Sequence, residues 1–174
     1  MSMRRIMKVL SIGLFALGAF AIVGADGVDA ANKQEDAKKF HEQLKTTKDA
    51  KKKIEALEEL GKLSTIMASY SEAAIPDIAK ALEDKDAGVR KAAAISYGKS
   101  SADPKEAVPA LTKLLKEDKS EDVKIGAAQG LAAMGSNAKD ALGDLRDLQK
   151  SEDKKSKLGR AAGEAVKAIA GKKK

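Results

Sequence analysis

The chain has 174 residues, of which 43% are hydrophobic and 34% charged, and 33 Lys and Arg against 26 Asp and Glu give a net charge of +7. That length fits one domain, and the apolar share suffices for a core, which excludes a wholly disordered chain. The sequence contains no cysteine and only 3% aromatic residues. This composition excludes disulfides, thiolate metal sites and a thiol nucleophile, and it disfavours a sheet protein.

The first thirty residues have the pattern of a secretory signal peptide. A basic start is followed by an uncharged apolar run over residues 9–25, and small residues come next. This order predicts that residues 1–30 are a signal peptide cleaved after Ala25 or Ala30. The alternative is an uncleaved anchor, because the apolar run is close to the minimum length that spans a bilayer. After cleavage we expect a periplasmic or extracellular protein that does not insert into the membrane.

The remainder of the sequence repeats itself. The string Ala-Ile-Pro-Asp-Ile at residues 74–78 returns as Ala-Val-Pro-Ala-Leu at residues 107–111. Such self-similarity at a period of about 34 residues is typical of repeat architectures. The predicted units are 35–64, 74–100, 107–136 and 141–170.

Each unit is predicted to hold two amphipathic helices joined by a charged turn. In the unit 107–136, apolar residues recur at three- and four-residue steps, which form one stripe on a helix. Pro109 is expected in the first turn of its helix, where a missing N–H is tolerated. Gly135 is expected to end the second helix of its unit, and the second helix of the unit 74–100 is expected to end near Gly98. The connector 64–73 is left open as either a helical extension or a flexible joint.

Two of the units share a longer motif, in which an aspartate precedes Val-Arg or Val-Lys and a pair of alanines follows. The residues are Asp86, Val89, Arg90, Ala93, Ala94 and Gly98, and then Asp122, Val123, Lys124, Ala127 and Ala128. This motif resembles the HEAT repeat of the short bacterial, phycobilisome-lyase-like type. The resemblance implies an all-α fold over residues 35–170, a short right-handed α-solenoid of about four helical hairpins of the armadillo-type class. Residues 171–174 would form a basic tail.

The same resemblance assigns a structural role to the charged residues of the motif. In HEAT arrays this cation and the aspartate just upstream commonly form a ladder of ion pairs and turn contacts between repeats. We therefore expect Asp86 with Arg90, and Asp122 with Lys124, to belong to such a ladder rather than to a ligand site.

A protein-binding face is also implied by the family, whose second helices typically line the concave side of the array. The polar residues beside the apolar stripe of those helices are then the candidate contacts, acidic toward the first unit and basic toward the last. The alternative is a solvated polar face with no partner. The candidates are Lys91, Ser96, Gln129, Arg160, Glu164 and Lys167, with Glu55, Glu58 and Glu59 in the first unit.

No catalytic, cofactor or metal grouping is found in the sequence. His41 is the only histidine, so a nucleophilic triad has a single possible base. The acidic turns lack the spacing of a calcium-binding loop. Nucleic acid is disfavoured as a partner because few aromatic residues are available for base stacking. We therefore expect a protein that is not an enzyme.

The leading hypothesis is an exported, non-enzymatic HEAT-repeat scaffold that binds another protein or peptide through its concave surface. One alternative is a bilin-lyase-like HEAT enzyme or subunit, to which the repeat type points. Another alternative is an electrostatic binder of anionic envelope polymers, because the chain is basic. The sequence leaves the identity of the partner and the oligomeric state open.

Overall fold

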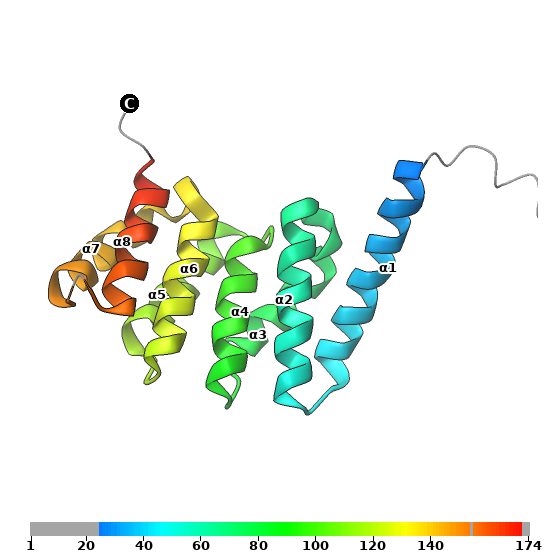
Figure 1. The fold of residues 1–174 in the computed structure, drawn as a ribbon, viewed down its shortest axis with the longest axis horizontal. Coiled ribbons are helices and arrows are strands. Elements are labelled where there is room, and N and C mark those ends of the chain that lie inside the picture. Colours follow the sequence, from blue (N-terminus) through cyan, green and yellow to red (C-terminus); the bar gives the residue numbers. More distant parts are fainter. Residues whose placement is uncertain (1–24, 154, 172–174) are drawn as a thin grey trace, which may run out of the picture. The chain divides into compact units, whose positions relative to one another are not determined.

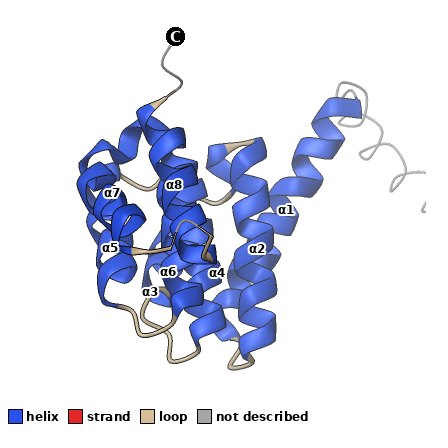
Figure 2. Ribbon diagram, turned by 60° about the vertical axis from the view of Figure 1, so that its left-hand side comes forward, coloured by secondary structure: helices blue, strands red, loops and turns tan. Residues whose placement is uncertain are grey.

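The computed structural model describes residues 25–153 and 155–171, and in these residues helices are joined by short loops without any strand (Figure 2). Residues 1–24 of the predicted signal peptide lie outside the described residues, as does most of the basic tail, whereas residues 25–30 belong to the first helix. Residues 1–35 and 36–174 form two separate compact units, so each is described by itself. In the described part of the first unit, Lys33 forms an ion pair with Asp29 one helical turn earlier.

The helices come in consecutive pairs, and the predicted all-α solenoid of helical hairpins is confirmed. The first helices of the pairs are α1 (Ala25–Thr46), α3 (Ile75–Ala81), α5 (Pro104–Glu117) and α7 (Leu142–Ser151). The second helices are α2 (Ala50–Ile66), α4 (Ala87–Lys99), α6 (Glu121–Met134) and α8 (Lys157–Ala170). Short 3-10 turns are η2 (Ala68–Tyr70), η3 (Glu72–Ala74) and η4 (Gly135–Ala141).

The second helices form one continuous layer. In Figure 1, α2, α4, α6 and α8 stand side by side, with α3, α5 and α7 behind them. Neighbouring second helices contact each other far more extensively than neighbouring first helices do. The second helices therefore lie close together while the first helices are spaced apart. This difference places the second helices on the inner side of the stack, as in other helical solenoids.

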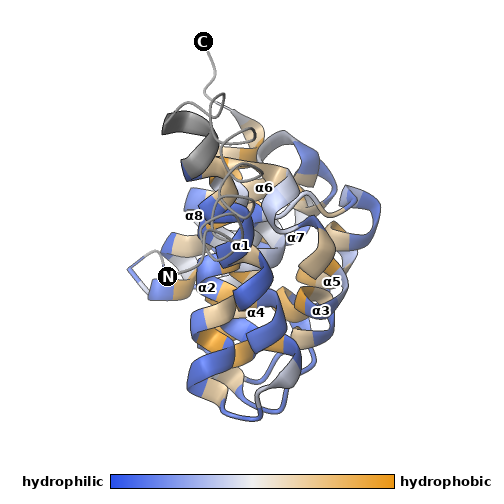
Figure 3. Cartoon of the chain, turned by 90° about the vertical axis from the view of Figure 1, so that its right-hand side faces the viewer, coloured by the Kyte–Doolittle hydropathy of each residue, from blue (hydrophilic) through white to orange (hydrophobic). Residues whose placement is uncertain are grey.

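The core lies between the two layers and runs along the stack. Hydrophobic and hydrophilic residues alternate along the helices (Figure 3), and the separation into an apolar and a polar side is clearest in α5, α7 and α8. Large side chains that are fully buried come from every pair, among them Leu57, Ile78, Leu111, Leu145 and Ile169. No pair could bury these residues alone, and stacking makes the core continuous.

The α4 and α6 backbones meet at glycines. A Cβ atom on Gly98 would lie 2.1 Å from the carbonyl oxygen of Gly130, and one on Gly130 would lie 2.3 Å from that of Ala94. The helix α4 ends at Lys99, so the prediction of an end near Gly98 is correct, although Gly98 itself is still helical. Its lack of a side chain serves interhelical contact instead, as small residues do wherever helix backbones approach closely.

Two other expected helix boundaries can be compared with the structure. Gly135 follows α6 with a φ of 55°, a conformation that favours glycine, so the predicted stop is correct. Pro109 is inside α5, because that helix begins earlier, at Pro104. The carboxylate of Asp103 accepts a hydrogen bond from the N–H of Lys105 at 2.9 Å and so caps the helix.

The connector between the first two pairs is built of 3-10 turns. Tyr70 is buried against Ala37 and Leu63, and it fixes the connector to α1 and α2. Ser64 and Ser71 are both buried and hydrogen-bonded to each other through their hydroxyl groups. The segment is therefore packed onto the first pair, although Ile66 and Met67 are exposed at its start.

Candidate functional site on the second helices

A polar groove crosses α4, α6 and α8 on the inner layer. It has a volume of about 360 Å³, and its lining includes four residues that the sequence analysis proposed as contacts. These four, which three different helices bring together, are Lys91, Gln129, Arg160 and Glu164. A further groove of about 300 Å³ on α8 and α7 adds the candidate Lys167 beside Arg160 and Glu164.

Another groove lies between α2 and α4, with a volume of about 450 Å³. Ser96 lines this groove but is only 1% exposed, so it does not project outward as predicted. The reason is that α2 passes close by: a Cβ atom on Gly61 would lie 3.2 Å from the Ser96 Oγ. The buried Oγ has no hydrogen-bond partner in the described part of the chain.

The three glutamates expected on α2 point in different directions. Glu58 lines the α2–α4 groove. Glu59 forms an ion pair with Lys62 at 2.6 Å. Glu55 accepts a hydrogen bond from the Gln43 side chain of α1 at 3.2 Å, so it belongs to the contact with the first helix.

Cations outnumber anions along the grooves of the inner layer. The predicted gradient from an acidic to a basic end is not observed, because lysines accompany Glu58 at the α2 end. We call this surface the inner face and define it by its charged residues. They are the cations Lys62, Lys91, Lys99, Lys157, Arg160 and Lys167, and the anions Glu58, Asp122 and Glu164.

Arg90 connects two successive pairs at the edge of the stack. Its Nε and Nη2 donate to the two carboxylate oxygens of Asp118 at 2.8 and 3.0 Å, and its Nη1 donates to the carbonyl oxygens of Asp84 and Lys85. The hydrogen bond from Arg90 and its charge lower the pKa of Asp118, and the same bond raises the pKa of Arg90. The partner is therefore an aspartate of the following turn, not the upstream Asp86 that the sequence analysis expected.

The first two pairs are connected in the same way. Lys53, near the start of α2, forms an ion pair with Asp84 at 2.6 Å. Burial raises the pKa of Asp84, but hydrogen bonds from the Asp86 N–H and from Lys53 outweigh it, so the pKa lies below its ordinary value. Lys124, the corresponding residue of α6, has no ion pair in the described residues.

The two aspartates proposed for the ladder have other positions. Asp86 caps α4, where its side chain accepts a hydrogen bond from the Val89 N–H at 3.1 Å. Asp122 is exposed at the start of α6, with a carboxylate oxygen 3.6 Å from the Nζ of Lys91. Asp86 thus forms no ion pair with Arg90, and Asp122 forms none with Lys124.

The two aspartates that connect the pairs, Asp84 and Asp118, have a signal in the sequence that the repeat motif did not include. They recur with the period of the repeat, as does Asp153, and each of the three accepts a hydrogen bond from the N–H two residues later. This contact closes the turn between the two helices of a pair. The sequence motif pointed instead to Asp86 and Asp122, because these lie closer to the Val-Arg or Val-Lys residues of the repeat.

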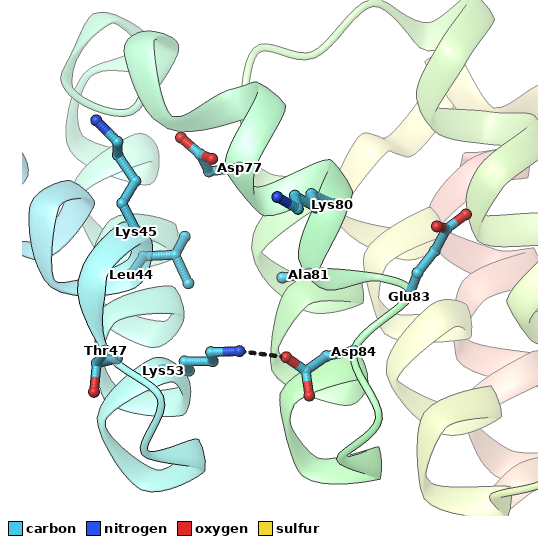
Figure 4. A pocket seen from close by; sticks show the side chains of 9 residues that line it. All are labelled: Leu44, Lys45, Thr47, Lys53, Asp77, Lys80, Ala81, Glu83 and Asp84. Atoms are coloured by element: carbon cyan, nitrogen blue, oxygen red, sulfur yellow. Dashed lines mark hydrogen bonds and ion pairs between the residues drawn. The ribbon is translucent and has the colours of Figure 1, made fainter.

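A separate cleft, of about 340 Å³, lies on the side of the first helices (Figure 4). Lys45 and Thr47 at the end of α1 face Lys80 and Asp77 of α3 across it. At one end of the cleft, the charges of Lys53 and Asp84 neutralise each other in the ion pair described above. The carboxylate of Asp77 is bonded to His41 Nε2 at 2.8 Å. This pairing gives His41 a structural contact between α1 and α3.

The described residues contain no group of three or more His, Asp or Glu side chains placed to hold a metal ion. In the same part of the chain, no helix is both long enough and apolar enough to cross a membrane.

Paired helices stacked in two layers, with the second helices on the inner side, define an α-solenoid protein. The sequence pattern of HEAT repeats matches residues 37–132, more than half of the chain. The chain therefore belongs to the HEAT-repeat family, as its motif predicted. A search of curated proteins gave no match to it. HEAT repeats commonly mediate protein–protein interaction.

Proposed function

We propose that this chain is an exported, non-enzymatic HEAT-repeat scaffold that binds another protein through the inner face. The observation that supports it most is the groove in which Lys91, Gln129, Arg160 and Glu164 meet. These residues come from α4, α6 and α8, so only the stacked array presents them together. Extended surfaces of this kind are the ones that solenoid proteins use for binding.

A crosslinking comparison tests the use of this face. A photo-crosslinking amino acid is placed at Gln129 on the inner face or, as the matched control, at Lys139 in η4, which is also exposed. We expect one crosslinked product of defined mass from the Gln129 position, lost when excess unlabelled protein competes, and none from Lys139. Equal labelling from both positions, or no product from either, would contradict the proposal.

Export is tested by the N-terminus of the protein after expression. Mass spectrometry should find a chain that begins at Asp26 or Ala31 and that fractionates outside the cytoplasm. The packing of α1 onto α2 supports either site, because the buried contacts come from Ala37 and Leu44, beyond both. An intact chain in the cytoplasm would contradict export and leave the binding proposal to its own test.

The excess of cations also favours a second candidate, an electrostatic binder of anionic envelope polymers. Exposed charges are screened within about 10 Å at 0.1 M salt. Retention on a polyanion column that is lost at modest salt, without any saturable protein partner, would favour this candidate over the scaffold.

A further inference from the structure

The groove between α2 and α4 differs from the rest of the inner face because its floor is apolar. Ile54 of α2 and Ala92 and Ile95 of α4 line it. A Cβ atom on Gly88 would lie 3.0 Å from the Ile54 Cδ1, so Gly88 allows Ile54 to pack against α4, and Gly61 of α2 also lines the groove. Its volume of about 450 Å³ exceeds the 360 Å³ of the groove across α4, α6 and α8. A space of this size suits one large side chain and part of the backbone that carries it.

The position of the groove follows from how the neighbouring helices pack. Between α4 and α6, Gly98 and Gly130 bring the backbones into direct contact, so no space remains. Between α2 and α4 the approach is less close, because a Cβ atom on Gly61 would lie 3.2 Å from the Ser96 Oγ and 3.3 Å from its Cα. The inner face therefore has one open apolar groove near its first pair and a closed contact at the next.

Ser96 is the buried polar residue beside this groove. The residue is 1% exposed, and its Oγ has no partner in the described part of the chain. A buried hydroxyl without a hydrogen bond costs about 1–3 kcal/mol. Because this hydroxyl is enclosed between α2 and α4, the accessible floor of the groove is formed by its apolar neighbours.

The rim of the groove is positively charged. Lys62, Lys91 and Lys99 line it, against Glu58 as the single acidic residue. Lys62 and Lys91 have acidic neighbours at 2.6 and 3.6 Å, whereas Lys99 has no ion pair in the described residues. The groove therefore complements a ligand that carries negative charge on both sides of an apolar group.

We propose that the α2–α4 groove binds an acidic peptide segment of the partner protein, with one large apolar side chain seated between Ile54 and Ile95. Carboxylates on either side of that residue face Lys62 and Lys99. A buried apolar anchor surrounded by polar contacts is how compact peptide sites obtain their affinity. This inference rests on the proposed function, because it names the chemistry of the partner at one part of the inner face.

The first test uses defined peptides and nuclear magnetic resonance of the isotope-labelled full chain. The probe is the capped peptide Asp-Glu-Leu-Glu-Asp, and the controls replace Leu by Ser or all four acids by Lys. We expect the probe to shift the amide signals of Gly61, Ala92 and Ser96 in a saturable way. The Ser peptide should bind more weakly, and the Lys peptide should leave these signals unchanged.

The second test changes the rim without touching the core. Lys62→Glu with Lys99→Glu alters two exposed residues of the groove, and Lys119→Glu with Lys139→Glu makes the same charge change at exposed residues elsewhere. Since each exposed ion pair is worth up to about 1 kcal/mol, we expect the groove variant to raise the Kd about tenfold and the control variant to leave it nearly unchanged.

The outcomes separate this inference from the proposed function. Shifts confined to α6 and α8 would overturn the groove assignment but leave the inner face as a binding surface. An absence of shifts on all the second helices, together with no crosslink at Gln129, would contradict both. Tighter binding of an oligonucleotide of equal charge than of the probe would also overturn the inference, because an apolar floor gives phosphates nothing to contact.

Discussion

The guanidinium of Arg90 and the carboxylate of Asp118 form a two-pronged ion pair between successive repeats, 28 residues apart, with N–O distances of 2.8 and 3.0 Å. The side chains are only 17% and 6% exposed. Lys116 and Asp144 are also 28 residues apart and pair at 2.9 Å, but their side chains are 57% and 35% exposed. Two pairs of equal spacing thus differ in geometry and in burial.

A double-mutant cycle should separate the two pairs. For Arg90→Met and Asp118→Asn we expect a coupling of about 1.5–3 kcal/mol in the free energy of unfolding, because the hydrogen bonds are charge-assisted and partly buried. The cycle of Lys116→Met and Asp144→Asn should give a much smaller coupling, since solvent screens that pair. Urea denaturation measures both. Equal couplings would show that burial does not decide the strength of these contacts.

The stabilisation by Asp118 should depend on pH. The hydrogen bond and charge of Arg90 lower the pKa of this carboxyl in the folded chain. Its contribution is therefore fully present above the unfolded pKa of about 3.9, and it is lost as the pH falls through the lower folded pKa. We expect the destabilisation caused by Asp118→Asn to be constant near neutral pH and to shrink below about pH 4. Urea denaturation over this pH range measures it.

The control for this pH dependence is the same substitution in the Arg90→Met background. Arg90 is the first cause of the lowered pKa of Asp118, so removing it should make the effect of Asp118→Asn smaller and flatter with pH. A pH dependence that is unchanged in that background would show that another contact, such as the Ser120 N–H, holds the carboxylate.

Glycine substitutions should distinguish close backbone contact from an exposed position. At Gly98 a Cβ atom would lie 2.1 Å from a carbonyl oxygen of α6, so Gly98→Ala must push the two helices apart. We expect a loss of about 1–3 kcal/mol despite the better helix propensity of alanine. Gly143, exposed in α7, has no neighbouring atom within 4 Å, and Gly143→Ala should gain about 0.5–1 kcal/mol. Thermal denaturation of both variants provides the comparison, and stabilisation by Gly98→Ala would contradict the contact.

The repeat pattern predicted the fold because period and amphipathicity are local properties of the sequence. The helix pairs and the stop at Gly135 follow from apolar spacing and backbone preference. The role of Gly98 could not be predicted this way, because a helix stop and a close contact both favour glycine. Only the position of α6 decides between them.

The candidate site was predicted in part for a similar reason. Helical spacing places Lys91, Gln129, Arg160 and Glu164 on one side of their helices, and stacking then brings them together. Ser96 has the same kind of spacing, but its burial depends on how closely α2 approaches. The partner of Arg90 is also set by the stack, because Asp118 belongs to the following repeat.

The residues that precede α4 and α6, Asp86 and Ser120, give a prediction about how each helix start contributes to the free energy of unfolding. Asp86 caps α4 through a hydrogen bond from the Val89 N–H, whereas Ser120 precedes α6 without a side-chain cap bond. Asp86→Ala should therefore cost about 1 kcal/mol, and Ser120→Ala should have a smaller effect. Chemical denaturation measures the difference. A larger loss for Ser120→Ala would mean that its hydroxyl, rather than its backbone, holds the turn.

Two buried serines should respond to alanine in opposite directions. The Ser96 Oγ has no partner, so Ser96→Ala removes an unsatisfied hydroxyl and should leave the free energy of unfolding unchanged or raise it by up to about 1 kcal/mol. The Ser64 Oγ donates to the Leu60 carbonyl oxygen at 3.0 Å and contacts the Ser71 hydroxyl. Ser64→Ala leaves that second hydroxyl without its partner and should cost about 1–2 kcal/mol. Urea denaturation of both variants tests the pair. If Ser96→Ala destabilises the chain as much as Ser64→Ala does, the Ser96 hydroxyl has a hydrogen-bond partner within the fold.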